Sequence, residues 1–174
     1  MVPSSPSTQA VNEPIVFGAD GFPQWSRTYA DAWIGLLGTH RRLTRELDGA
    51  LEAAHGLTLS GLELLARLAS AADHRLRLSV LAGEAGLSLS RVSRIVDALE
   101  ERSLIERQPC PGDARAINAQ LTAEGLALAQ AAQSTHLAAV RECFFDHLSS
   151  REIVTLAAVF GRFSPDAGSA CAAG

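Results

Sequence analysis

The sequence predicts a mainly α-helical protein that carries one short β-hairpin. Ala and Leu are abundant while aromatic residues make up only 5% of the chain, a composition that favours helices. Apolar residues recur at steps of three and four along most of the chain, and only after Leu104 does the pattern change to alternation. A chain of 174 residues fits one domain with a substantial core.

The two ends of the chain differ in composition from the middle. Residues 1–24 carry four of the seven prolines, so we expect a flexible N-terminal arm there, and residues 164–174 a flexible tail. The folded domain then spans residues 25–163. No apolar stretch reaches the length of about 18 residues that a membrane span needs, and the N-terminus lacks the order of basic and then apolar residues that is typical of a signal peptide. These features predict a cytoplasmic protein without membrane contact.

The first two helices follow from apolar spacing and from capping residues. A long helix is expected from about Ser26 to Ala54, ended by Gly56, because one apolar stripe runs along it. Its members are Trp33, Leu36, Leu37, His40, Leu43, Thr44 and Leu47. A second helix follows Ser60, which forms a capping-box pattern with Glu63.

Two further helices are joined by a tight glycine turn. Ser79 is expected to cap a short helix, Val80–Ala85, which Gly86 ends. Ser88 or Ser90 then begins a helix over Arg91–Arg102, with Val92, Ile95, Val96 and Leu99 facing inward. This is the outline of a helix-turn-helix.

The hairpin follows directly. Residues 105–107 and 116–121 alternate as two short strands, and residues 109–113 between them have turn chemistry. Thr122 and Gly125 begin a long helix to about His147, and Ser149 or Ser150 caps a last one, Glu152–Phe163. The prediction is a winged helix-turn-helix over residues 57–122 with a two-stranded wing, flanked by dimerisation helices over residues 25–56 and 123–163.

The stretch LAGEAGLSLSRVSRIVDALEERSLIERQPCPGDARAINAQLTAEG resembles the MarR family of bacterial regulators. The likeness is most specific in Asp113-x-Arg115, followed by Leu121-Thr122 and Gly125. The resemblance implies a homodimer with intertwined terminal helices, whose two winged lobes grip a pseudo-palindromic DNA operator. It also implies repression that small aromatic acids or oxidants release.

Charge placement agrees with a DNA partner although the net charge is −4. The stretch from Arg75 to Arg115 contains seven Arg and six acidic residues, whereas the rest of the chain contains eight Arg and thirteen acidic residues. The N-terminal residues of a recognition helix reach base edges, so the candidate readers are Ser90, Arg91, Ser93 and Arg94. The alternative is that Arg91 and Arg94 are ordinary solvated arginines.

Other arginines are assigned to the DNA backbone and the minor groove. Arg115 on the wing suits a narrow minor groove, and Asp113 either orients it or is an ordinary turn aspartate. Arg75, Arg77 and Arg107 are candidate phosphate contacts, with plain surface roles as the alternative.

A small-molecule site is predicted on the first helix. Trp33 and His40 share one face, with Arg41 beside them, which would suit an aromatic carboxylate. The alternative is that Trp33 and His40 belong to the core or to the dimer contact.

Cysteine and histidine residues suggest two weaker hypotheses. Cys110, expected in an exposed wing turn beside Arg107, would be a redox-sensitive thiol. His136, Cys143 and His147 share a helical spacing that suits a metal, but dimer packing explains it more simply. We expect no metal and no cofactor.

The sequence contains none of the nucleophile, phosphate-loop or metalloprotease motifs that would indicate an enzyme. Together with the resemblance to the MarR family, this leads us to expect a ligand-responsive repressor. The alternatives are a thiol redox-switched regulator acting through Cys110, and a constitutive architectural DNA-binding protein.

Overall fold

The computed structural model describes residues 14–110 and 113–163, and in residues 113–115 only the backbone. The chain divides into two compact units, one up to Arg42 and one from Leu43 onward. The boundary falls within the first helix, α1 (Arg27–His55), and each unit is considered by itself.

The N-terminal unit contains a β-hairpin and the first half of α1. Strands β1 (Ile15–Phe17) and β2 (Pro23–Trp25) pair antiparallel, with Val16 opposite Gln24. The ring of Trp25 stacks on that of Tyr29 at a centroid distance of 6.3 Å. The predicted flexible arm is thus wrong for residues 15–24, while residues 1–13 lie outside the described part. No residue from 14 to 42 is buried in this unit.

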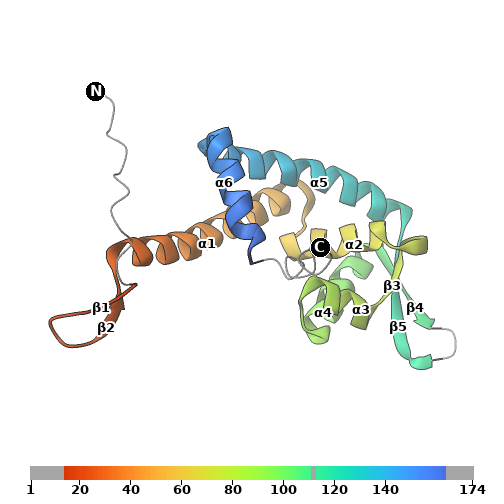
Figure 1. The fold of residues 1–174 in the computed structure, drawn as a ribbon. Coiled ribbons are helices and arrows are strands. Elements are labelled where there is room, and N and C mark those ends of the chain that lie inside the picture. The colour runs from red at the N-terminus through yellow and green to blue at the C-terminus, as the bar shows by residue number, and fades with distance from the viewer. Residues whose placement is uncertain (1–13, 111–112, 164–174) are drawn as a thin grey trace, which may run out of the picture. The chain divides into compact units, whose positions relative to one another are not determined.

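The larger unit contains the winged helix-turn-helix (Figure 1). After the end of α1 come α2 (Leu59–Ser70), a 3-10 turn η1 (Ala72–His74), β3 (Arg75–Arg77), α3 (Leu78–Ala85) and α4 (Leu89–Glu101). The hairpin β4 (Ile105–Cys110) and β5 (Asp113–Leu121) follows, then α5 (Ala123–Cys143), η2 (Phe145–His147) and α6 (Ser150–Gly161). The prediction of a mainly α winged helix protein with long terminal helices is confirmed.

The core of this unit is built around α2, which contributes more of the fully buried side chains than any other element. Apolar residues of the helix-turn-helix, the sheet and the end of α1 surround it, so that the two helices α3 and α4 have fixed positions. The largest fully buried side chains are Leu51, Leu64, Leu65, Leu68, Leu81, Val92, Val96 and Ile105.

Two of the predicted helix caps, Ser60 and Ser79, are wrong. Thr58, not Ser60, caps α2, since its hydroxyl accepts from the amide of Gly61. Ser79 does not cap α3, because that helix already begins at Leu78. Gly86 ends α3 in a left-handed conformation (φ 63°), and Ser88 caps α4.

The predicted two-stranded wing, β4 and β5, is present, and a third strand that the sequence did not predict, β3, pairs with it. The strand order is β3-β5-β4, and both neighbours of β5 are antiparallel to it. Strand β3 pairs only with residues 118–120 of β5, whereas β4 runs along β5 out to Cys110. The outer part of the hairpin is therefore a two-stranded ribbon.

The C-terminal helices end close to where the sequence predicted, with one difference. Helix α5 stops at Cys143 and Phe144 leaves helical geometry, so His147 lies in η2 and not on α5. Ser149 caps α6 in a capping box with Glu152. Among the described residues, no helix is long and apolar enough to span a membrane.

Candidate DNA-binding site

Helix α4 presents a polar face to solvent because its apolar residues are used in the core. Val92, Val96 and Leu99 are buried. The side chains of Ser90, Arg91 and Arg94 are exposed near the N-terminal end of the helix. Side chains at this end of a recognition helix reach base edges in the major groove. The two arginines carry five donors each in a planar fork, the geometry that guanine accepts.

Arg91 and Arg94 also border an open groove between α4 and the start of α2. Its volume is about 520 Å³, and Leu57, Thr58 and Gly61 form the opposite wall. The Arg91 guanidinium lies 3.4 Å from the hydroxyl of Ser60, a long hydrogen bond on an exposed surface. Such a contact restrains Arg91 only weakly.

The structure brings Ser93 together with Arg107, away from the exposed arginines. The Nη2 group of Arg107 donates to both the hydroxyl and the carbonyl oxygen of Ser93 at 3.1 Å. Its Nη1 group pairs with Asp97 and, at 3.3 Å, with Glu100, while its backbone amide donates to Glu100 at 2.9 Å. The geometry therefore gives no support to the predicted phosphate contact of Arg107 or to base reading by Ser93.

The Arg107 network holds strand β4 against α4. Ser93, Asp97 and Glu100 lie on one face of α4, at spacings of four and three, and Arg107 reaches them from β4. Only 25% of the Arg107 side chain is exposed. Because the guanidinium is shared among two carboxylates and a serine, it fixes the wing relative to the recognition helix.

Arg75 and Arg77 lie on β3, the short edge strand of the sheet that the sequence did not predict. Both side chains are exposed, and Arg75 lies 3.7 Å from Asp73. Both side chains are accessible to a DNA backbone, and the phosphate contact of Arg75 and Arg77 stays a prediction.

The wing residues are only partly described. Asp113 and Arg115 lie at the start of β5, but their side chains are outside the described part, so their predicted roles stay predictions. Cys110 corrects the sequence prediction: it is buried in β4, 6% exposed, and its thiol donates to Asn118 Oδ1 at 3.0 Å. The expected exposed thiol in a wing turn is wrong.

The structure gives a physical role to Thr122, one residue of the motif formed by Leu121-Thr122 and Gly125. The Thr122 hydroxyl donates to the carbonyl oxygens of Ser103 and Leu104 and accepts from the amide of Gly125. This ties the start of α5 to the residues between α4 and β4. Thr122 and Gly125 were predicted as a helix start, but their contact with residues 103–104 was not visible in the sequence.

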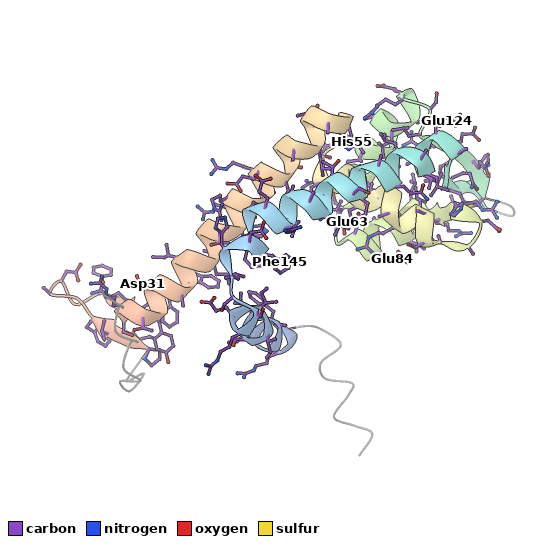
Figure 2. All side chains as sticks on the ribbon, turned by 90° about the horizontal axis from the view of Figure 1, so that it is seen from above. Asp31, His55, Glu63, Glu84, Glu124 and Phe145 are labelled. Carbon is purple, nitrogen blue, oxygen red and sulfur yellow. The ribbon has the colours of Figure 1, made fainter. Side chains whose placement is uncertain are left out.

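The predicted ligand residues Trp33, His40 and Arg41 all belong to the N-terminal unit and are exposed on α1, Trp33 by 54%. The groove beside α4 and a second cavity of about 510 Å³ near Glu63 and Glu84 (both labelled in Figure 2) are lined by other residues. The aromatic-acid site remains a prediction.

The metal hypothesis loses its geometric basis. His136, Cys143 and His147 were placed on one helical face, but α5 ends at Cys143. Within the described residues, no group of three or more His, Cys, Asp or Glu side chains is arranged to hold a metal ion.

These features define a winged helix-turn-helix protein with an arginine-bearing recognition helix. The family model described as MarR family matches residues 57–117. AbsC, a MarR family transcriptional regulator from Streptomyces coelicolor, is 31% identical, and its structure matches with a TM-score of 0.73 over 80% of this chain and 94% of AbsC. The chain belongs to the MarR family of transcriptional regulators.

Two further relatives agree with this assignment. Sco3205, a MarR family regulator from Streptomyces coelicolor solved in complex with DNA, is 30% identical with a TM-score of 0.73, covering 79% of this chain and 87% of Sco3205. The transcriptional regulator PecS of Dickeya dadantii is 28% identical over 131 residues, 73% of this chain and 78% of PecS.

Proposed function

We propose that this protein is a sequence-specific DNA-binding repressor that binds a pseudo-palindromic operator as a homodimer. The observation that carries the proposal is the exposed pair Arg91 and Arg94 on the polar face of α4, whose opposite face is buried. The solved complex of the similar Sco3205 with DNA supports the same use of the fold. Arg75 and Arg77 would contact phosphates, and Arg115, oriented by Asp113, would reach the minor groove.

The dimer is supported by apolar side chains that one chain leaves uncovered. No residue of α6 is buried, and its apolar side chains Val154 and Phe160 are exposed. In the N-terminal unit, Trp33 and Ile34 of α1 are likewise exposed. We propose that a second copy related by a two-fold axis covers these side chains, since exposed apolar surface is the kind that protein interfaces bury.

Bound as a dimer over a promoter, the protein would block transcription by occupying the site. It would act in the cytoplasm, where bacterial DNA lies, and as a regulator and not an enzyme. For release, we propose a small aromatic acid contacting Trp33, His40 and Arg41. The redox alternative through Cys110 is disfavoured because that thiol is buried and hydrogen-bonded.

In vitro selection from random duplex DNA tests the proposal. The wild-type protein should enrich a two-fold symmetric sequence and bind it in a gel shift, and the Arg91→Ala/Arg94→Ala double variant should lose that preference. Titrating the complex with salicylate and other aromatic acids tests release, with His40→Ala as the variant expected to respond less. Failure to enrich any sequence would contradict sequence-specific binding. An architectural binder would instead bind without enrichment or release.

A further inference from the structure

Arg102, the residue after α4, reaches back to the end of α1. Its Nη1 group donates to the carbonyl oxygen of Gly56 at 2.5 Å and its Nη2 group to that of His55 at 2.9 Å. The last carbonyls of a helix have no partner within the helix, and a cation near them is favoured by the helix dipole. The planar fork of one arginine therefore joins the C-terminal ends of α1 and α4.

His55 continues the connection to a third helix. Its Nε2 atom lies 2.8 Å from the hydroxyl of Thr135, which belongs to α5. Figure 2 shows His55 at the end of α1. One residue thus contacts α5 through its side chain and Arg102 through its carbonyl oxygen. The ends of α1 and α4 and the middle of α5 are thus linked by hydrogen bonds.

We propose that Arg102 is a positioning residue that sets the angle of the recognition helix against α1, and through α1 the spacing of the two recognition helices in the dimer. The inference rests on the proposed function, in which α1 and α5 belong to the dimer and α4 enters the major groove. Apolar packing of Val92, Val96 and Leu99 buries α4 but is not directional. Two hydrogen bonds from one guanidinium at its end supply the direction.

A phosphate contact is the competing role for Arg102, because its side chain is exposed and lines the same groove as Arg91 and Arg94. The two roles differ in their dependence on salt. Removing a phosphate contact lowers the slope of log K against log salt concentration by about 1 per contact. Removing a positioning contact leaves the slope unchanged, because no counterion release is lost.

The experiment uses the full-length chain and the duplex that the wild-type protein selects in vitro. Binding of wild type, Arg102→Ala and Arg102→Lys is measured on this duplex and on duplexes whose half-sites are moved apart or together by one base pair. Arg102→Ala should bind the original spacing about tenfold more weakly and discriminate less among the spacings. Arg102→Lys should recover part of the discrimination, since an ammonium reaches one carbonyl but does not bridge two.

Salt titrations of the three proteins and of Arg75→Ala separate the outcomes. An unchanged salt slope for Arg102→Ala supports positioning, and circular dichroism with light scattering verifies that the variant is folded and dimeric. The inference is overturned if Arg102→Ala binds with the affinity and spacing preference of wild type. It is also overturned if the salt slope of Arg102→Ala falls by the amount expected for a lost phosphate contact. Neither result contradicts the proposed function. If wild type selects no duplex, the proposed function fails and this inference fails with it.

Discussion

Gly125 lies so close to the carbonyl oxygen of Leu104 that a methyl group on Gly125 would overlap it. The same oxygen accepts hydrogen bonds from both the amide and the hydroxyl of Thr122, each at 3.1 Å. The start of α5 is therefore packed directly on the backbone between α4 and β4. Only glycine leaves room for that approach.

Gly125→Ala should lower the free energy of unfolding by about 2 kcal/mol, since backbone, unlike a flexible side chain, does not yield to the added methyl group. Chemical denaturation measures the change. Gly83→Ala is the matched control: Gly83 is helical with open space around its Cβ position, so this change should raise stability by about 0.5–1 kcal/mol. Equal effects at the two sites would contradict the close packing of Gly125.

Arg94→Ala should weaken binding to the selected operator by about 1–3 kcal/mol and relax the base preference at one position in each half-site. The reason is that Arg94 is exposed on the polar face of α4. Competitive gel shifts with single-base variants of the operator measure the preference. An equal loss on random DNA would instead make Arg94 a phosphate contact.

Arg107→Ala should weaken operator binding without reducing the salt slope, because the guanidinium is bonded to Ser93, Asp97 and Glu100. A double-mutant cycle with Asp97→Ala should show a coupling energy for stability of about 0.5–3 kcal/mol. Additive effects of the two changes would argue against the ion pair, and a reduced slope would restore the phosphate role.

Deleting α6, by ending the chain after Leu148, should give a folded monomer. No residue of α6 is buried within one chain, so its removal does not open the core, but it removes apolar surface assigned to the partner. Light scattering gives the mass, and thermal unfolding tests whether the lobe is intact. A deletion protein that remains dimeric at micromolar concentration would contradict the role of α6.

Ser149→Ala should raise the pKa of Glu152 towards its ordinary value. The hydroxyl and then the backbone amide of Ser149 hydrogen-bond the Glu152 carboxylate and lower its pKa below 4.5. A lowered carboxyl pKa gives stability that is present at neutral pH and is lost as the pH falls through the folded-state value. NMR titration of Glu152 measures the shift, with Ser150→Ala as the matched control. An unchanged pKa in Ser149→Ala would show that the capping box is not formed.

The helices were predictable because their signals are local. The apolar spacing of Val92, Val96 and Leu99 identifies α4 and its buried face without knowledge of any other element. Strand β3 was missed because it has three residues, with only Leu76 apolar, and it pairs with β5 more than forty residues later in the chain. Three residues are too few to show alternation.

The candidate site was predictable only where exposure follows from the helix face, as for Arg91 and Arg94. The contacts of Arg107 were not predictable because its partners come from α4, so they depend on how β4 folds back. The spacing of Ser93, Asp97 and Glu100 on one face was a usable signal. Cys110 was misplaced because the extent of β4, and the irregular register at Pro109/Cys110, are not encoded in local composition.

The register of the sheet has an evolutionary consequence. Because β3 covers only residues 118–120, the hairpin beyond them is constrained by pairing between its own two strands. Insertions or deletions there keep every side chain on its original face only when they add or remove two residues in each strand. Divergence in hairpin length among related chains should therefore occur in steps of two residues per strand, lengthening the reach of the tip while the base beside α3 is inherited unchanged.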